Sequence, residues 1–347
     1  MSRLRALVTA TFSAAGLSQL RECMDVEYHN WFDQRRAFSE DELFHMLRDK
    51  DIFIFEEEMV TRRLLEEHKS LKVLACCRGL RGDSPDIDVP YCQEHSIPIL
   101  VAPGRNAHSV AEMTILLTLG VLRQLPVTLR WLHEHQWKNP KDFITTFRTN
   151  ELAGKTVGII GFGNIGRRAA AIFKAFGVRL LAADPYVNDP ALYAQYDVEH
   201  VDLDTLLRES DVVSLHMNVS AETKGMIGAR ELALMKPTAI LINTARAVLV
   251  DHDALYDALA NRRIAGAGVD VFHVEPANPS NEPLLRLDNF FATPHVGGTA
   301  WEVANYHSAM IVDGLFRLLR GEKPAHMLNP EVLDQFWAKN GIMLQAR

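Results

Sequence analysis

Cysteine is scarce in this sequence, because its 347 residues include only Cys23, Cys76, Cys77 and Cys92. None of them belongs to a C-x-x-C pair or to a cluster of cysteines and histidines, so the ligand spacing of a structural zinc site is missing. We therefore expect no metal site. The same scarcity excludes a small disulfide-stapled domain and favours a reduced protein of the cytoplasm.

An excess of positive charge is missing as well. The formal net charge is -7, and the lysines and arginines are scattered along the chain. This disfavours binding to nucleic acid or to an anionic membrane surface. No window approaches the roughly 20 apolar residues that a membrane-spanning helix needs. Arginines precede small apolar residues near the start, as in a signal peptide, but polar residues interrupt that run and favour a first strand.

Strand-like and helix-like segments alternate through most of the chain. A helical segment between two apolar runs begins with a capping box formed by Ser39 and Glu42. A long helical stretch runs from Ala107 to Pro126 and then resumes, and clearer alternation begins at Lys155. This pattern predicts an α/β fold with two doubly wound parallel-sheet domains. The runs typical of strands cover residues 5–12, 51–55, 71–77, 97–101, 155–160, 179–184, 211–216, 238–243, 264–272 and 289–293.

A glycine-rich loop separates an apolar run from a helical segment. It reads Gly161-Phe162-Gly163-Asn164-Ile165-Gly166, which is the G-x-G-x-x-G spacing. Gly161 permits a tight turn, Gly163 lets the backbone approach a pyrophosphate, and Gly166 lets the helix pack on the strand. The helix N-terminus then offers free N–H groups to phosphates. The pattern alone is weak, but the flanking strand and helix favour dinucleotide binding over a chance glycine turn.

An acidic residue ends the next strand-like run. Asp184 lies 18 residues after Gly166, close to the offset of about 20 at which a carboxylate binds the ribose hydroxyls of a dinucleotide. A carboxylate there repels the 2′-phosphate of NADP, and no arginine directly follows it, so NAD is the expected cofactor. The alternative is a solvated acid at a strand end.

Charged and titratable residues stand at the ends of the last three predicted strands. Arg246 follows the first of these strands, Asp270 and Glu275 stand within and beyond the second, and His295 follows the third. Taken singly, each could be a surface charge or a turn residue. Ligands of a doubly wound sheet bind at the carboxyl ends of its strands, so we expect these residues to face one crevice.

The chemistry of these side chains suits one reaction. The planar guanidinium of Arg246 can bind a carboxylate through two N–H donors. The imidazole of His295 could be packed core or a metal ligand, but it can also exchange a proton with a hydroxyl or carbonyl oxygen. Glu275 can fix the tautomer of that imidazole. Beside a nicotinamide, the set fits oxidation of a hydroxyl next to a carboxylate, or the reverse reduction.

The motifs, in their order along the chain, resemble those of the NAD-dependent D-isomer-specific 2-hydroxyacid dehydrogenases. The similarity runs from about residue 50 to residue 330 and includes "VAPGRNAHSVAE", "GKTVGIIGFGNIGR", "INTARAVLVD", "GVDVFHVEP", "TPHVGGTA" and "LNPEV". It implies that Arg246 binds the substrate carboxylate, and that His295 is the catalytic acid and base with Glu275 as its partner. It also implies a dinucleotide pocket made by the glycine loop with Asn164, Ile165, Asp184, His216, Thr244 and Ala245, and by Asp270 at the nicotinamide carboxamide.

The resemblance also implies a domain organisation. A flavodoxin-like substrate domain is formed by residues 1–104 and 297–347, and a Rossmann domain for NAD, residues 105–296, is inserted into it, with a cleft between the two. The substrate is a small 2-hydroxy or 2-oxo acid. Members are commonly dimers, so we expect a homodimer.

The loop at residues 76–88 departs from the family pattern. The usual G-x-G-x-D-x-[IV]-D is replaced by "CCRGLRGDSPDID". The backbone near Gly79 and Leu80 is still expected to meet a substrate carboxylate, because N–H groups bind anions without particular side chains. Arg78 falls near the place where phosphoglycerate dehydrogenases of the family carry a phosphate-binding arginine. Arg78, Arg81 and Arg105 therefore indicate either a substrate with a second anionic group or solvated loop arginines.

A non-enzymatic function is the alternative from a different class. The same fold is reused in a transcriptional corepressor that senses the nucleotide, and such proteins can retain the site residues. The joint presence of Arg246, Glu275 and His295 favours turnover. The direction of the reaction is not set by the sequence.

Overall fold

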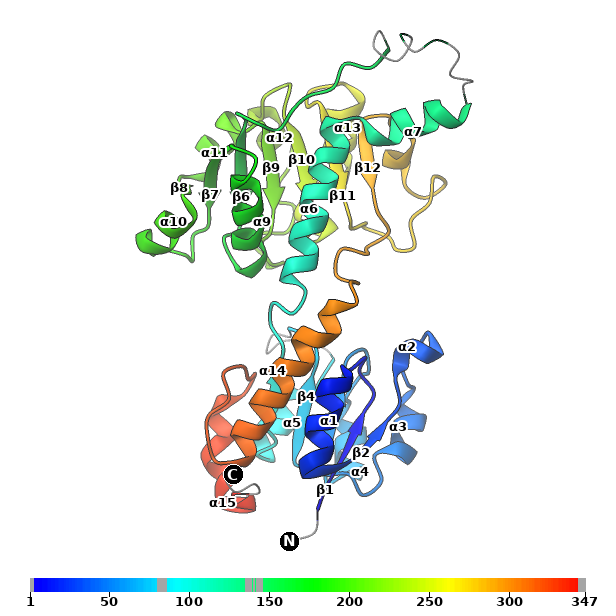
Figure 1. The fold of residues 1–347 in the computed structure, drawn as a ribbon, viewed down its shortest axis with the longest axis vertical. Helices are drawn as coiled ribbons and strands as arrows, with labels where there is room; N and C mark the ends of the chain where they lie inside the picture. The colour runs from blue at the N-terminus through cyan, green and yellow to red at the C-terminus, as the bar shows by residue number, and fades with distance from the viewer. Residues whose placement is uncertain (1–2, 80–85, 135–138, 140, 142–145, 343–347) are drawn as a thin grey trace. The chain divides into compact units, whose positions relative to one another are not determined.

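The computed structural model describes residues 3–79, 86–134, 139, 141 and 146–342. The chain divides into two compact units, which we call unit 1 (Met1–Arg105 with Trp301–Arg347) and unit 2 (Asn106–Ala300). Each unit is built on a parallel sheet flanked by helices (Figure 1). The predicted α/β class with two doubly wound sheets is confirmed.

Unit 1 contains a sheet of five parallel strands in the order β2-β1-β3-β4-β5. This is the flavodoxin-like order that the family resemblance implies. Its elements are β1 (Leu4–Val8), α1 (Ala14–Cys23), β2 (Met24–Tyr28), α2 (Trp31–Gln34), α3 (Glu40–Met46), β3 (Ile52–Phe55), α4 (Arg62–Glu67), β4 (Val73–Cys76), α5 (Val89–Glu94), β5 (Ile99–Val101), α14 (Glu302–Leu319), η3 (Pro330–Val332) and α15 (Leu333–Asn340).

The inner strands of unit 1 form where the sequence predicts them, because β3, β4 and β5 are continuous apolar runs that are buried throughout. The edge strand β2 is not predicted, since its residues are partly polar and several of them are exposed. The predicted capping box is confirmed: Ser39 accepts the backbone N–H of Glu42, and the Glu42 carboxylate accepts that of Ser39. Helix α14 covers one face of the sheet, and its Ile311 and Leu315 belong to the same buried cluster as Leu100.

A buried polar network joins three segments of unit 1 that are distant in sequence. Glu56, just after β3, is 6% exposed and is ion-paired with Arg105. The Arg105 Nη1 group also lies 3.0 Å from Nδ1 of His307 on α14. The other ring nitrogen of His307 is hydrogen-bonded to the carbonyl oxygen of Thr11, which can only accept. His307 therefore carries its proton on Nε2, and burial lowers its pKa.

Acid sensitivity follows from Glu56. Burial by itself raises the pKa of this carboxyl, but the charge and hydrogen bond of Arg105, with the hydrogen bond of Trp31 and the charge of His307, together outweigh burial, so the pKa lies below the usual 4.5. The ionised Glu56 carboxylate stabilises the folded state fully above pH 4.5, the usual pKa of this group in the unfolded chain. This stabilisation is lost as the pH falls through the lower pKa of Glu56 in the folded state, because the unfolded chain takes up the proton first. Glu56→Gln leaves Arg105 buried without a counter-charge, so it should lower the free energy of unfolding by about 3–5 kcal/mol at pH 7. It should also weaken the fall of stability with decreasing pH, which we call the acid limb.

The measurement is the midpoint of thermal unfolding between pH 3 and pH 8, with the exposed Glu66→Gln in α4 as the matched control. Equal acid limbs in Glu56→Gln and in the unsubstituted protein would show that another carboxyl controls the transition.

Unit 2 contains a sheet of seven parallel strands in the order β12-β11-β10-β9-β6-β7-β8. The chain starts in the centre at β6, builds outward to β8, and then returns to build the other half, as in a Rossmann fold. Its elements are α6 (Ala107–Leu122), α7 (Leu125–Glu134), β6 (Thr156–Ile160), α9 (Asn164–Lys174), β7 (Arg179–Ala183), α10 (Pro190–Tyr196), β8 (Glu199–His200), α11 (Leu203–Glu209), β9 (Val212–Leu215), α12 (Ala229–Leu234), β10 (Ile240–Asn243), η1 (Ala247–Leu249), α13 (His252–Ala260), β11 (Gly266–Val269), η2 (Pro283–Arg286) and β12 (Phe290–Ala292).

Helix α6 begins directly after the boundary between the units and packs along β10, β11 and β12 (Figure 1). Gly268 of β11 gives it room, since a Cβ at this glycine would come within 3.1 Å of Leu117 Cβ. Among the described residues, no single helix is long and apolar enough to cross a membrane. Only α6 and α7 taken together reach that length and composition, and they are bent by 60° at their break.

Candidate functional site

The glycine loop lies between β6 and α9 and has the geometry that a dinucleotide requires. Gly161 has φ +94, and a Cβ there would come within 2.7 Å of the backbone nitrogen of Met217, so only glycine fits. A Cβ at Gly166 would lie 2.2 Å from the carbonyl oxygen of Gly161, which forces close packing of helix on strand. A Cβ at Gly163, by contrast, would meet nothing within 4 Å, so this side of the loop is open to a ligand.

The N-terminus of α9 is also available to an anion. Its N-cap is Gly163, no side chain caps it, and its first turn holds no acid. The N–H groups of this turn are therefore directed at the open side of the loop. Asn164 lies in this turn with its Oδ1 accepting from Arg167, and Ile165 follows it half-buried. These residues fit the pyrophosphate of a dinucleotide.

Asp184, directly after β7, braces the glycine loop. Its carboxylate accepts the backbone N–H of Phe162 at 2.7 Å and that of Tyr186 at 2.9 Å. The half-buried carboxylate therefore stands at the edge of the loop, at the position where the sequence predicts a ribose ligand.

Replacing Asp184 with alanine should raise the KM for NADH by about 10–100-fold and weaken the discrimination against NADPH, because a hydrogen bond to a charged group is worth about 1.5–3 kcal/mol. Steady-state kinetics with both cofactors measure this effect. Asp189→Ala, which removes only the N-cap of α10, is the matched control. An unchanged cofactor preference in Asp184→Ala would remove this residue from the ribose site.

His216 and Thr244 follow β9 and β10. The Nε2 atom of His216 lies 2.9 Å from the hydroxyl of Ser214, and burial lowers the pKa of the imidazole to about 4, so the ring is neutral at pH 7. Within the described part of the chain, its buried Nδ1 has no hydrogen-bond partner. This is expected of a residue that lines a binding site and is hydrogen-bonded only when the ligand is bound. Thr244 is buried, and its hydroxyl lies 2.9 Å from that of Thr114 on α6, so it anchors the strand end to this helix.

Three adjacent strands bring the remaining candidates together. The register aligns Asn243, Val269 and Ala292, the last residues of β10, β11 and β12. The sheet pattern continues one step further, since the N–H of Asp270 donates to the carbonyl of Asn243 at 3.0 Å. Arg246, Glu275 and His295 belong to the loops that leave this common edge, as the sequence predicts for residues beyond the carboxyl ends of parallel strands.

Glu275 and His295 form a hydrogen-bonded pair. The Nδ1 atom of His295 lies 2.9 Å and 3.1 Å from the two carboxylate oxygens. Burial raises the pKa of Glu275, but the hydrogen bonds from His295 and from the Phe272 N–H, with the charges of His295 and Arg246, outweigh it and lower that pKa. An ionised carboxylate can only accept, so Nδ1 of His295 carries the proton, and Nε2 has no hydrogen-bond partner among the described residues.

The guanidinium of Arg246 is held by its own turn. Its Nη1 donates to the carbonyl of Ala245 at 2.6 Å, and within the described ranges no carboxylate forms an ion pair with it. The turn is fixed by Asn243, whose amide donates to the Arg246 carbonyl and whose Oδ1 accepts the N–H of Ala245. Asn243 is not predicted from the sequence. The sequence signal that could have revealed it is an amide residue that ends an apolar strand-like run, and the structure shows this side chain to be only 2% exposed.

The predicted substrate loop of unit 1 is only partly described. Leu80 and Arg81 lie outside the described residues. A Cβ at Gly79 would come within 2.9 Å of Pro103 Cα, so the loop backbone runs close against the segment after β5. The guanidinium of Arg78 is bonded to two carboxylates, Glu57 at 3.3 Å and Asp86. Arg78 is therefore neutralised within the protein.

Arg105, the other described arginine considered for a second anionic group, is also engaged. Its side chain is 14% exposed and ion-paired with Glu56. Arg246 thus differs from Arg78 and Arg105, because no carboxylate among the described residues is ion-paired with it.

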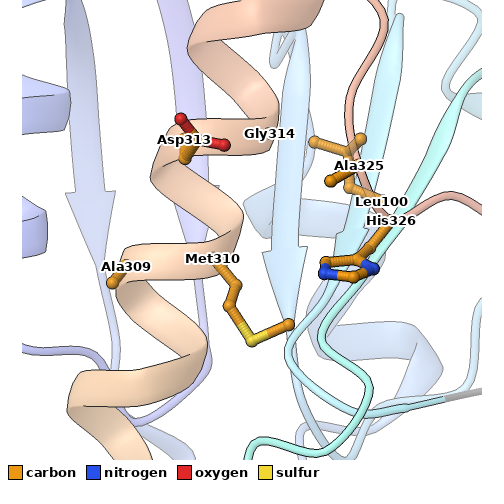
Figure 2. A pocket seen from close by; sticks show the side chains of 7 residues that line it. All are labelled: Leu100, Ala309, Met310, Asp313, Gly314, Ala325 and His326. Atoms are coloured by element: carbon orange, nitrogen blue, oxygen red, sulfur yellow. The ribbon is translucent and has the colours of Figure 1, made fainter. Parts of the chain in front are cut away.

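A cavity of about 290 Å³ lies elsewhere in unit 1, against helix α14 (Figure 2). Its walls come from β5, α14 and residues 325–326 rather than from any candidate site residue. Asp313 on its wall is paired with Arg317 at 2.8 Å, which leaves His326 as its other titratable group. We assign no role in the reaction to this cavity.

Comparison with known proteins identifies the family of this chain. Residues 115–297 match the family model of the D-isomer specific 2-hydroxyacid dehydrogenase NAD binding domain. The chain is 35% identical over 343 residues to a glyoxylate reductase of Thermofilum pendens, covering 96% of each chain. It is 33% identical to a D-3-phosphoglycerate dehydrogenase of Methanocaldococcus jannaschii, covering 96% of this chain and 60% of that one. A solved glyoxylate reductase from Paecilomyes thermophila superimposes with a TM-score of 0.76 at 26% identity, over 95% of this chain and all of that one.

Proposed function

Because this chain belongs to the D-isomer specific 2-hydroxyacid dehydrogenase family and is an NAD-dependent oxidoreductase, we propose that it interconverts a small D-2-hydroxyacid and its 2-oxo acid. The observation that supports the proposal is the hydrogen-bonded pair of Glu275 and His295. It lies at the same sheet edge as Arg246, whose guanidinium forms no ion pair with a carboxylate of the described residues. NAD, when bound, supplies or accepts the hydride. The open side of the glycine loop, the N-terminus of α9 and Asp184 are the groups that would hold it.

His295 moves the proton in this proposal. In the direction of reduction, its Nε2–H protonates the oxygen that develops negative charge at the former carbonyl. In the direction of oxidation, neutral Nε2 takes the proton of the hydroxyl. Glu275 holds the ring through Nδ1, and its negative charge stabilises the imidazolium. Arg246 binds the substrate carboxylate through two N–H donors, a positioning effect that can supply several kcal/mol of the barrier reduction.

The substrate class that best fits the described residues is a 2-oxo acid without a phosphate. An arginine that binds phosphate needs an available charge, but Arg78 already binds Glu57 and Asp86, and Arg105 already binds Glu56, while Arg81 lies outside the described residues. Replacing such a carboxylate by phosphate would leave a buried or half-buried acid unpaired, which is costly. Glyoxylate and hydroxypyruvate satisfy Arg246 and His295 without a second anionic site.

A substrate panel tests this proposal. NADH oxidation is followed by absorbance with glyoxylate, hydroxypyruvate and phosphohydroxypyruvate, using the unsubstituted protein and Arg78→Ala. We expect faster turnover of glyoxylate and hydroxypyruvate than of phosphohydroxypyruvate, and the same preference in Arg78→Ala. A preference for phosphohydroxypyruvate that disappears in Arg78→Ala would contradict the substrate assignment. Silence across the panel with tight NADH binding would instead indicate a nucleotide sensor.

A further inference from the structure

We propose that Asp270 is a positioning residue, which fixes the turn that carries His295. Its carboxylate accepts three hydrogen bonds from that turn: the Thr293 hydroxyl at 2.6 Å, the Val296 N–H at 2.9 Å and the Gly297 N–H at 2.7 Å. The donors lie on both sides of His295 in sequence. The inference rests on the proposed function, because it takes His295 as the proton carrier.

The turn needs such support because of its backbone. His295 has φ +55, in the left-handed region that residues with a Cβ seldom adopt. Its own N–H donates to the Thr293 carbonyl at 2.9 Å, which closes the turn tightly. The ring is exposed, so packing does not hold it in place. A strained conformation of this kind persists only where surrounding bonds determine it.

Asp270 is well placed to give that support. It directly follows β11, is 2% exposed, and is itself held by the hydrogen bond of its N–H to Asn243. Gly297 allows the close approach, because a Cβ there would lie 2.6 Å from Asp270 Oδ2. Both carboxylate oxygens are thus engaged by the turn. The ring of His295 is oriented by Glu275 and its backbone by Asp270, so two acids share the task.

This differs from the role implied by the family resemblance, in which Asp270 contacts the nicotinamide carboxamide. If Asp270 is a cofactor ligand, loss of the Thr293 hydroxyl should have little effect, but if Asp270 fixes the turn, that loss should matter. The Thr293 hydroxyl lies 2.6 Å from Asp270 Oδ1, and its other contact is a longer one of 3.8 Å to Met113 Sδ. Thr293→Val keeps the shape of the side chain and removes the hydroxyl that donates to Asp270. Thr293→Ser keeps the hydroxyl.

We expect Thr293→Val to lower kcat for glyoxylate reduction by about 10–100-fold, since displacement of a catalytic group by about 1 Å can cost about 100-fold. The dissociation constant of NADH, measured by fluorescence titration, should not change. The pH profile of kcat should shift, because the contact of His295 with Glu275 is loosened. Thr293→Ser should restore kcat and the profile. Asp270→Asn, which sets an amide N–H₂ against backbone donors, should lower kcat further.

Amide hydrogen exchange at Val296 and Gly297 gives a readout without cofactor or substrate. Exchange should be faster in Thr293→Val and Asp270→Asn than in the unsubstituted protein and Thr293→Ser. Unchanged exchange and an unchanged pH profile in Thr293→Val would contradict the positioning role of Asp270. An effect of Asp270→Asn on NADH binding alone would contradict it as well. If Asp270→Asn fails to fold, the Thr293 pair decides alone. If the unsubstituted protein is inactive but the exchange pattern is as expected, the proposed function would be wrong, while the role of Asp270 in fixing the turn would be supported.

Discussion

Replacing His295 with glutamine is expected to lower kcat for 2-oxo acid reduction by about 10³-fold, within the range of about 10²–10⁴ that a positioned acid–base group contributes. Glutamine can still accept and donate hydrogen bonds, but it cannot deliver a proton to the reacting oxygen. The structure gives His295 one nitrogen held by Glu275 and one left for that oxygen. Stopped-flow and steady-state measurements of NADH oxidation read the effect directly.

The matched control is His326→Gln. His326 lines the cavity of unit 1, and we assign this histidine no role in the reaction (Figure 2). It should keep kcat, and both variants should bind NADH as the unsubstituted protein does. A His295→Gln protein with nearly full kcat would mean that another group carries the proton.

Replacing Arg246 with alanine is expected to reduce kcat/KM for glyoxylate by about 10²–10³-fold, because losing one partner of a hydrogen-bonded charge pair costs about 2–5 kcal/mol. Most of the loss should appear in KM if the carboxylate is held equally in the ground state and the transition state. The unpaired state of this guanidinium in the described structure is what separates it from Arg78 and Arg105. Initial-rate kinetics over a wide range of glyoxylate concentrations give both parameters.

Arg246→Lys is the sharper variant. It keeps the charge but loses the two-pronged geometry, so it should recover only part of the lost kcat/KM. Arg263→Ala, which removes an exposed pair with Asp257, is the surface control and should have no effect. Full activity in Arg246→Ala would assign the carboxylate to another donor.

The parts of the site that depend on neighbours in sequence could be predicted from the sequence. The glycine loop needs glycine at fixed spacing because of its own turn and the helix that follows it, and those requirements are local. The order of strands in a doubly wound sheet then places loops after β10, β11 and β12 at one edge, so Arg246 and His295 could be assigned to it before any coordinates.

The partners of Arg78, Arg105 and Asp270 could not be predicted, although that of His295 could. Arg105 looks like a free cation in sequence, and only the fold brings Glu56 and His307 to it. The same holds for Arg78, whose ion pair with Glu57 weakens the hypothesis that this arginine binds a substrate phosphate. The hydrogen bonds of Asp270, which follows β11, join it to the turn of His295, which follows β12. Such contacts cannot be inferred from the periodicity or the motif spacing of the sequence.

The most direct test of this account is a crystal structure of the protein with NAD and oxamate, a stable analogue of a 2-oxo acid. We expect the oxamate carboxylate to accept two hydrogen bonds of about 2.7–3.1 Å from Arg246, and its carbonyl oxygen to lie within hydrogen-bond distance of Nε2 of His295. An oxamate bound away from Arg246, or a His295 whose Nε2 is bonded to the protein instead, would contradict it.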